Sequence, residues 1–398
     1  MQSDGWEWIP LKEILAEPIR NGTSPVESQE WTGVKMLGLG CLTDNGFEPR
    51  QLKNAPSIHY RNHVAVLRDG DLLVSRSNTR ELVGLAGIYR DIGVPCIYPD
   101  LMMRLRTSRS YLPEFLELVL RYPHIRSQIV ALAQGTSESM VKISGATLGE
   151  LAVPVVPVSG QRRIMKVIDA VSRQELAVKA SIAKLSAISA ATVDALMEGM
   201  AWDCTLSDAA DGAIRNGYSP VESEAWTGVQ MLGLGCLTPA GFNPIQLKNA
   251  PSSVTADHAA ILREGDLLMT RANTRELVGL AGVYRDVGTP CIYPDLMMRI
   301  RPSNRCSAEF LAAVLMSTRA RRQVRSLGQG TSESMVKISA ATVREILVPL
   351  PAFEEQNRLL GVLNSFSAQI RDKNAELGKL GAVKQGIVDD LLSGRVSV

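Results

Sequence analysis

The stretch Gln134-Gly-Thr-Ser-Glu-Ser-Met-Val-Lys-Ile-Ser144 returns unchanged at residues 329–339, which lie 195 residues further along this chain of 398 residues. Other segments repeat at the same offset, with no insertion or deletion between the copies. A period this long is typical of duplicated domains and excludes a solenoid of short repeats. The sequence therefore predicts one unit that is used twice. In the first copy the other repeated segments are 36–43, 51–57, 80–87 and 96–104.

The first part of each unit has the pattern of a mixed α and β domain. Residues 64–74 predict two strands joined by an Asp-Gly turn. Residues 101–106 alternate in hydrophobicity, which predicts a strand with Arg104 and Arg106 on one face. A helix is expected to begin at Pro113, because proline is tolerated in the first turn.

The second part of each unit has the pattern of one long helix. After Gln161 and again after Gln356, apolar residues recur in steps of three and four, which predicts helices of about 39 residues and about 58 Å. A lone helix would leave its apolar stripe in water, so we expect the two helices to pack together. The alternative is two core helices of larger domains. The stripes are Ile164, Ile168, Val171, Val178, Ile182, Leu185 and Leu196, and Leu359, Leu363, Phe366, Ile370, Leu377, Leu380, Ile387 and Leu391.

The composition fits a globular protein with real cores, at 45% hydrophobic and 21% charged residues. The sequence lacks a run of about 18 uncharged apolar residues, so we expect no transmembrane helix. The polar N-terminus lacks the signature of a signal peptide, which makes the cytoplasm the default location. A net charge of +2 argues neither for nor against nucleic acid, since a DNA-binding protein needs basic groups on one face.

The six cysteines include no Cys-x-x-Cys pair, and only four histidines accompany them. This spacing does not match a zinc site, so we expect no bound metal. We predict reduced, mostly buried thiols, because free cysteine behaves as a small apolar residue.

Several modest motifs, taken in order, indicate a family. The chain contains Trp8-Ile-Pro-Leu11, Gly22-Thr-Ser-Pro25 with its copy Gly217-Tyr-Ser-Pro220, Glu355-Gln356 at a helix start, and a closing Lys384-Gln-Gly-Ile-Val-Asp-Asp-Leu-Leu-Ser-Gly-Arg395. With these motifs the chain resembles, over essentially its whole length, the specificity subunit (HsdS) of a Type I restriction–modification system. The first unit departs from the pattern, because Gly160-Gln161 replaces Glu-Gln and its closing segment is weaker.

The resemblance implies an α+β fold in which two duplicated α/β target-recognition domains are separated by a long, coiled-coil-like antiparallel helical pair with pseudo-two-fold symmetry. The expected boundaries are 1–158 and 201–353 for the recognition domains, and 159–200 and 354–398 for the spacer helices. The implied partners are double-stranded DNA, two methyltransferase subunits and, in a system that cuts, restriction subunits. S-adenosylmethionine would belong to the methyltransferase, and this chain would bind no cofactor.

The duplication itself predicts the form of the DNA target. Two readers related by a two-fold axis contact half-sites in inverted orientation. The α/β parts are almost the same, whereas the helical parts share little beyond their pattern, which suggests that both domains recognise the same half-site. We therefore predict an interrupted inverted repeat, with the helix length setting the spacer.

Candidate DNA contacts are expected to be the same in both copies. This excludes Lys35, which becomes Gln230, and Arg61, which becomes Ala256. The strongest candidates lie in residues 75–80, because Arg can pair with guanine and Asn with adenine in the major groove. The alternative is a charged strand end with local ion pairs. The candidates and their copies are Arg76, Asn78, Thr79, Arg80, Arg271, Asn273, Thr274 and Arg275.

Residues 134–142 form a second candidate segment. Their Thr, Ser and Lys side chains suit phosphate contacts, although the segment could instead be a loop that caps the next turn. Arg104 and Arg299 could follow phosphates or simply be solvated. We interpret Trp31, Trp226, Tyr98 and Tyr293 as core residues. The second set of candidates is Arg104, Gln134, Thr136, Ser137, Lys142, Arg299, Gln329, Thr331, Ser332 and Lys337.

The sequence offers little for an autonomous enzyme. It contains glycine pairs but no full nucleotide fingerprint, P-loop or Gly-x-Ser-x-Gly motif. The Asn/Asp-Pro-Pro-aromatic motif of an adenine methyltransferase is missing as well. We therefore predict a non-catalytic subunit. The alternative is a repeat scaffold that binds a protein or another ligand, which steep salt dependence of DNA binding would exclude.

Overall fold

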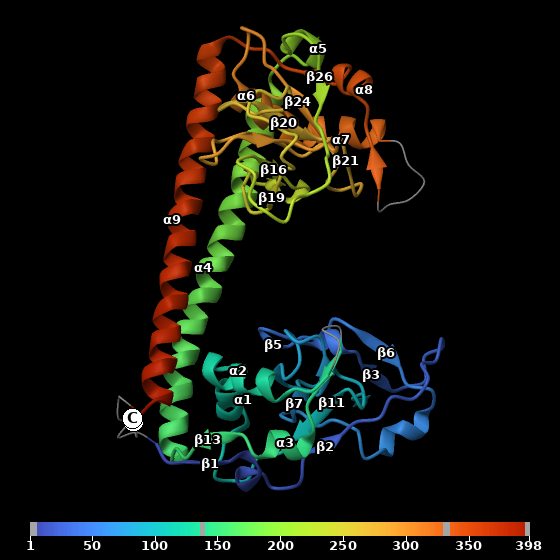
Figure 1. Cartoon of the computed structure of the whole chain (residues 1–398), viewed down its shortest axis with the longest axis vertical. Helices are drawn as coiled ribbons and strands as arrows, with labels where there is room; N and C mark the ends of the chain where they lie inside the picture. Colours follow the sequence, from blue (N-terminus) through green and yellow to red (C-terminus); the bar gives the residue numbers. More distant parts are fainter. Residues whose placement is uncertain (1–5, 136–139, 329–334, 395–398) are drawn as a thin grey trace. The chain divides into compact units, whose positions relative to one another are not determined.

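The computed structural model describes residues 6–135, 140–328 and 335–394. The chain divides into two compact units. The first combines Met1–Ala177 with Leu377–Val398, and the second is Val178–Glu376. Each unit contains one α/β domain together with parts of both long helices (Figure 1).

The first unit is built around a four-stranded antiparallel sheet in the order β2-β11-β7-β9, beside a three-stranded sheet in the order β10-β3-β6. Three two-stranded pairs, β1-β13, β4-β5 and β8-β12, complete the domain. The strands are β1 (Trp8–Pro10), β2 (Arg20–Asn21), β3 (Lys35–Leu37), β4 (Leu42–Thr43), β5 (Gly46–Phe47), β6 (Leu52–Asn54), β7 (Leu72–Ser75), β8 (Ser77–Asn78), β9 (Ala86–Ile88), β10 (Cys96–Ile97), β11 (Met102–Leu105), β12 (Val141–Lys142) and β13 (Ala152–Pro154).

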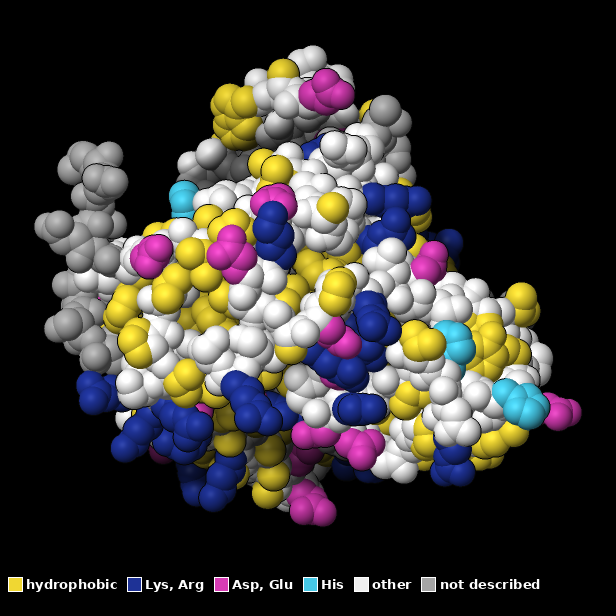
Figure 2. Space-filling model, turned by 90° about the horizontal axis from the view of Figure 1, so that it is seen from below, with side chains coloured by type: hydrophobic (Ala, Val, Ile, Leu, Met, Phe, Trp, Pro, Cys, Tyr) yellow, Lys and Arg dark blue, Asp and Glu magenta, His cyan; other side chains and the backbone are white. Residues whose placement is uncertain are grey.

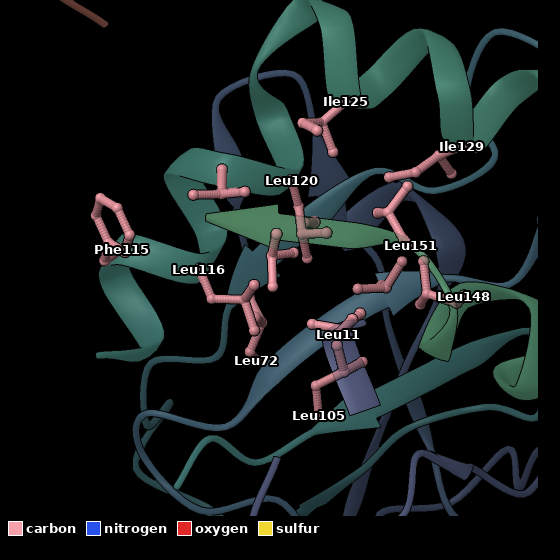
Figure 3. Close-up of a cluster of buried hydrophobic side chains, with 14 of the residues drawn as sticks. Leu11, Leu72, Leu105, Phe115, Leu116, Leu120, Ile125, Ile129, Leu148 and Leu151 are labelled. Atoms are coloured by element: carbon pink, nitrogen blue, oxygen red, sulfur yellow. The ribbon is translucent and has the colours of Figure 1, made fainter. Parts of the chain in front are cut away.

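Three helices accompany these strands: α1 (Pro113–Arg121), α2 (Pro123–Leu132) and α3 (Gly145–Gly149). As predicted, α1 begins at Pro113, and its apolar face contributes Phe115 and Leu116 to the core. They belong to the same buried cluster as Leu72 and Leu105 from the central sheet, and Leu116 lies near Leu72 (Figure 3). Alternating positions on the central strands thus face two cores: Leu72 and Leu105 pack with the helices, whereas Leu73 and Met102 belong to a second cluster on the other face. Short 3-10 helices lie at Leu11–Ile14, Leu39–Cys41 and Ile58–Asn62.

One sequence prediction in this region is wrong. Residues 64–74 do not form a hairpin, because β7 pairs with β9 and β11 instead. Only Val66 forms a bridge before the turn, and its partner is Ile97. Gly70 does provide the predicted turn, with a φ of 86° that favours glycine.

The second unit repeats this topology strand for strand. Its sheets have the orders β15-β24-β20-β22 and β19-β16-β23, with the pairs β14-β26, β17-β18 and β21-β25. The elements are β14 (Cys204–Thr205), α5 (Leu206–Ala209), β15 (Arg215–Asn216), β16 (Gln230–Leu232), the 3-10 helix Leu234–Cys236, β17 (Leu237–Thr238), β18 (Gly241–Phe242), β19 (Leu247–Asn249), β20 (Leu267–Thr270), β21 (Ala272–Asn273), β22 (Ala281–Val283), β23 (Cys291–Ile292), β24 (Met297–Ile300), α6 (Ala308–Met316), α7 (Thr318–Leu327), β25 (Val336–Lys337), α8 (Ala340–Arg344) and β26 (Leu347–Val348).

The two long helices are α4 (Val158–Glu198) and α9 (Phe353–Leu392). In the first unit the start of α4 packs against the end of α9, where Ile164 and Ile168 share a core with Val388. In the second unit the end of α4 shares a core with the start of α9, through Met197 and Leu359. The helices therefore run antiparallel. Every predicted stripe position is buried or half-buried.

Helix α4 bears on the expectation that the chain has no transmembrane helix. Among the described helices, α4 alone is long and apolar enough to cross a membrane, and 11% of its apolar stretch is buried. Length and composition are weak evidence for a membrane-spanning helix, since helices of soluble proteins can have the same length and composition. Both ends of α4 contribute to a core, with Ile164 in the first unit and Met197 in the second.

Candidate nucleic-acid interface

The first candidate segment lies at the end of the central sheet. Strand β7 ends at Ser75, and the backbone N–H groups of Arg76 and Ser77 both donate to the carbonyl of Leu101, at 2.8 and 3.2 Å. The guanidinium of Arg76 is half-buried and donates to the carbonyl of Asp100 at 3.2 Å. Local backbone bonds therefore fix where this arginine leaves the sheet.

The structure brings the two candidate segments together. Strand β8 pairs antiparallel with β12, so that Ser77 lies opposite Lys142 and Asn78 opposite Val141. Gln134 in turn exchanges two backbone hydrogen bonds with Lys142, each 2.8 Å long. Ser77 and Asn78 are thus neighbours of Val141 and Lys142 on one ladder, which Gln134 extends.

The second unit has the same ladder. Strand β21 pairs with β25, which places Lys337 opposite Ala272 and Val336 opposite Asn273. The side chains of Lys142 and Lys337 are both exposed, as are those of Arg80 and Arg275. Each unit therefore presents two basic side chains beside a half-buried Asn. Of the other candidates, Arg271 and Thr79 with its copy Thr274 are half-buried, and Gln134 is exposed.

The asparagines make a local hydrogen bond that orients their side chains. The Oδ1 of Asn78 accepts from the N–H of Thr79 at 2.9 Å, and Asn273 accepts from Thr274 at 2.8 Å. Within the described residues the side-chain N–H groups of both asparagines remain unpaired. An oriented amide with free donors suits recognition of a base edge.

Two predicted DNA contacts are wrong. Arg104 is 4% exposed and Arg299 is 6% exposed, so neither can reach a phosphate. Arg104 donates to the carbonyl of Val64 at 3.2 Å, and Arg299 donates to that of Ile261 at 2.9 Å. Both guanidinium groups also lie over a buried tyrosine ring. These arginines fasten an irregular segment to the sheet. Of the remaining predictions, Thr136, Ser137, Gln329, Thr331 and Ser332 lie outside the described residues.

Sequence reasoning missed a polar contact next to Arg76. The hydroxyl of Ser24 donates to the carboxylate of Asp100 and accepts from its backbone N–H at 3.1 Å. A side chain at Gly22 would overlap the carbonyl oxygens of Tyr98 and Pro99, so only glycine allows this close approach. The same bond joins Ser219 to Asp295. The repeated Gly-x-Ser-Pro motif was the available signal.

The interpretation of the two tryptophans as core residues is also wrong. Trp31 is 55% exposed and Trp226 is 56% exposed, whereas Tyr98 and Tyr293 are buried as predicted. Lys35 lies over the ring of Trp31, 5.0 Å from its centroid. Figure 2 shows that Lys and Arg side chains form several groups on the face in view, with acidic side chains between them. Charge alone therefore does not outline a binding face there.

The fold and its paired basic segments define a duplicated α/β protein with two long helices. No protein-family model matches the chain. It is 26% identical over 160 residues to the Type I restriction enzyme EcoKI specificity subunit of Escherichia coli K12, which covers 40% of this chain and 34% of that protein. It is 28% identical over 142 residues to the MjaVIII specificity subunit of Methanocaldococcus jannaschii, covering 35% and 32%.

The matches span about a third of the length of these curated relatives. A solved structure from work on assembly and conformational transition of the type I R-M system aligns over 100% of both chains, with a TM-score of 0.60 and 20% identity. The resemblance to Type I specificity subunits is therefore confirmed.

Proposed function

We propose that this chain is the DNA-reading subunit of a Type I modification complex and recognises an interrupted inverted repeat. The observation that carries the proposal is the pairing of β8 with β12, which β21 and β25 repeat in the second unit. Two segments with side chains suited to DNA, far apart in sequence, meet at one place in each domain. Relatives that are named as specificity subunits support the same role.

Each part of the ladder suits a different kind of contact. Arg76 and Asn78 have the donors that pair with guanine and adenine in the major groove. The exposed ammonium groups of Lys142 and Lys337 suit phosphates, which hold the protein in register without reading sequence. Because the second unit carries Arg271 and Asn273 in equivalent positions, both domains would read the same half-site.

The proposed partners follow from the same role. Two methyltransferase subunits would supply S-adenosylmethionine and the chemistry, and this chain would contribute recognition alone, in the cytoplasm. Restriction subunits would join in a system that also cuts. The pseudo-two-fold relation of the two domains would invert one half-site with respect to the other, with the helical pair setting the spacer.

The test is a map of modified bases in DNA from cells that express the chain with its methyltransferase, compared with cells that lack the chain. We expect a methylated adenine in both halves of an interrupted inverted repeat. The double variant Arg76→Ala with Arg271→Ala should lose this pattern while the complex still assembles. Arg68→Ala with Arg263→Ala is the matched control, since both arginines are exposed and repeated but lie outside the ladder.

Two outcomes would contradict the proposal in different ways. An asymmetric target would overturn the inverted repeat and leave DNA reading intact. A complex that assembles but adds no modification, and binds DNA without salt dependence, would overturn DNA reading itself.

A further inference from the structure

We propose that Arg126 and Arg321 are positioning residues that hold the DNA-reading segments in place without touching DNA, and so determine how well each domain discriminates between bases. This inference rests on the proposed function. It concerns a half-buried guanidinium on α2 in the first unit and a buried one on α7 in the second.

In the second unit the guanidinium clamps one turn. Arg321 is only 7% exposed, and it donates to the carbonyls of Val278 and Glu276 at 2.5 Å each. This turn follows directly after Arg275, the last candidate of the reading segment. The planar fork of arginine suits two acceptors at once, which an ammonium group could not match.

The clamped turn is bonded to both ends of the reading segment. The N–H of Val278 donates to the carbonyl of Thr274 at 2.8 Å, and the N–H of Gly279 donates to that of Thr270 at 2.9 Å. Arg271 and Asn273 lie between these two anchor points. A displacement of the turn would therefore move the side chains that are proposed to read bases.

Stability alone is a poor reason for this arginine. In the described part of the chain Arg321 has only carbonyl oxygens as partners and forms no ion pair. Burial lowers its pKa to about 10, which shows how unfavourable the charged form is there. Burying a charge without an opposite charge beside it costs free energy, which the two hydrogen bonds offset only in part. The clamp on the turn is the feature that an apolar residue would lose.

The first unit has the same arrangement with one bond fewer. Arg126 donates to the carbonyl of Glu81 at 2.5 Å, while its Nη1 is buried without a hydrogen-bond partner. The turn again connects to both ends of its segment, through Val83 to Thr79 at 2.9 Å and Gly84 to Ser75 at 2.7 Å. The first domain should therefore hold its reading segment less tightly than the second.

The test uses the assembled methyltransferase complex with Arg321→Met and, separately, Arg321→Lys. Binding is measured to the mapped target, to targets with one changed base in the half-site read by the second domain, and to a non-specific duplex. We expect Arg321→Met to lower discrimination about tenfold, with non-specific affinity and its salt dependence unchanged. Arg321→Lys, which keeps the charge and can reach one carbonyl, should lie between this variant and the wild type.

Arg322→Met is the matched control, because Arg322 is the exposed neighbour on the same helix. It should leave discrimination unchanged. Equal loss of affinity for all duplexes in Arg321→Met, or discrimination equal to the wild type, would overturn the clamp. If the Arg321→Met complex does not assemble, hydrogen exchange of Arg321→Lys tests the clamp instead. The proposal then requires that the backbone N–H groups of Val278 and Gly279 lose protection, and unchanged protection would overturn it. A wild-type complex that does not discriminate at all would instead refute the proposed function.

Discussion

The side-chain carbonyl of Gln161 accepts a hydrogen bond from the backbone N–H of Leu112 at 2.7 Å. Gln161 is fully buried at the start of α4, and its amide also donates to the carbonyls of Ser110 and Val156 at 3.0 and 2.7 Å. Gln356 makes the equivalent three bonds at the start of α9. One glutamine thus joins the start of each long helix to the α/β domain of its unit. The replacement of Glu by Gly160 leaves this arrangement intact, because the glutamine makes the bonds.

Replacing either glutamine by methionine should destabilise its unit. Methionine has a similar shape and favours helices, but the variant removes three hydrogen bonds, of which the one to the carbonyl of Val156 is buried and the other two are part-buried. Each unsatisfied buried group costs about 1–3 kcal/mol, so Gln161→Met should lower the free energy of unfolding by at least that much. Urea unfolding measures the change. Gln369→Met, at an exposed position of α9, is the control and should have little effect. If Gln161→Met and Gln369→Met are equally stable, the hydrogen bonds of Gln161 contribute nothing to the stability of the unit.

Replacing Asn78 and Asn273 together by Asp should relax recognition at one base pair of each half-site. Aspartate keeps the Oδ1 that accepts from Thr79 or Thr274 but loses the side-chain donors. A good bidentate contact is worth about 1–3 kcal/mol of discrimination. Binding to single-base variants of the target, normalised to a non-specific duplex, measures the loss. Equal loss at every position would indicate charge repulsion rather than base reading.

Replacing Lys142 and Lys337 by Met should weaken binding to all sequences alike. If each lysine contacts one phosphate, the slope of log affinity against log salt should fall by about 1 per lysine. Discrimination between bases should stay the same, because phosphate contacts carry no sequence information. Salt titrations on cognate and non-specific duplexes give both quantities. A changed base preference with an unchanged slope would contradict the assignment.

Local patterns in the sequence predicted those features that depend on neighbouring residues. The start of α1 at Pro113 and the strand around Met103 follow from proline geometry and alternation, and both are found. The roles of Arg104 and Trp31 were not predictable in this way. Arg104 is buried because Val64, distant in sequence, accepts its hydrogen bond, and Trp31 is exposed because the chain before β3 lies at the surface.

The candidate site was likewise predictable only where it depends on local sequence. The repeat selected residues 75–80 and 134–142 separately, because each occurs unchanged or nearly so in both copies. That Lys142 lies opposite Ser77 depends on pairing between strands some 65 residues apart, for which neither segment carries a local signal. The turn clamped by Arg126 depends likewise on a contact between a helix and a distant loop.

The buried thiols should make stability decrease at high pH. Burial raises the pKa of Cys96 and of Cys291 to about 12 from the ordinary 9.0. A group whose pKa is raised in the folded state contributes stability that is present below pH 9 and is lost as pH rises toward 12. The double variant Cys96→Ala with Cys291→Ala should therefore lose less unfolding free energy than the wild type as pH rises from about 8 to about 10, on either side of the ordinary thiol pKa of 9.0. If the unfolding free energies of the variant and the wild type fall equally with pH, these thiols do not contribute to the pH dependence of stability.

Alkylation of the native protein provides an independent check. Among the six cysteines only Cys204 is not buried, so a maleimide should modify that thiol first and the others only on unfolding. Rapid modification of Cys96 in the native state would contradict the buried environment that raises its pKa.

Replacing Gly84 or Gly279 by alanine should damage both stability and base reading. Each has a φ of 76°, which costs about 1–2 kcal/mol for a residue with a side chain. A Cβ would also overlap Ile129 at Gly84 and Val324 at Gly279, so the turn must shift. Gly93→Ala separates these two effects, because Gly93 has a φ of 80° and open space around it.

We expect Gly93→Ala to lower the free energy of unfolding by the backbone contribution alone, and Gly84→Ala to lower it further. Because Gly84 donates to the carbonyl of Ser75, its variant should also reduce discrimination in the half-site read by the first domain, whereas Gly93→Ala should not. Urea unfolding and binding to single-base variants distinguish the two. If Gly84→Ala and Gly93→Ala are equally stable, α2, which carries Ile129, must move to make room for the added methyl group at residue 84. Unchanged discrimination in Gly84→Ala would mean that the position of this turn does not control how the reading segment meets DNA.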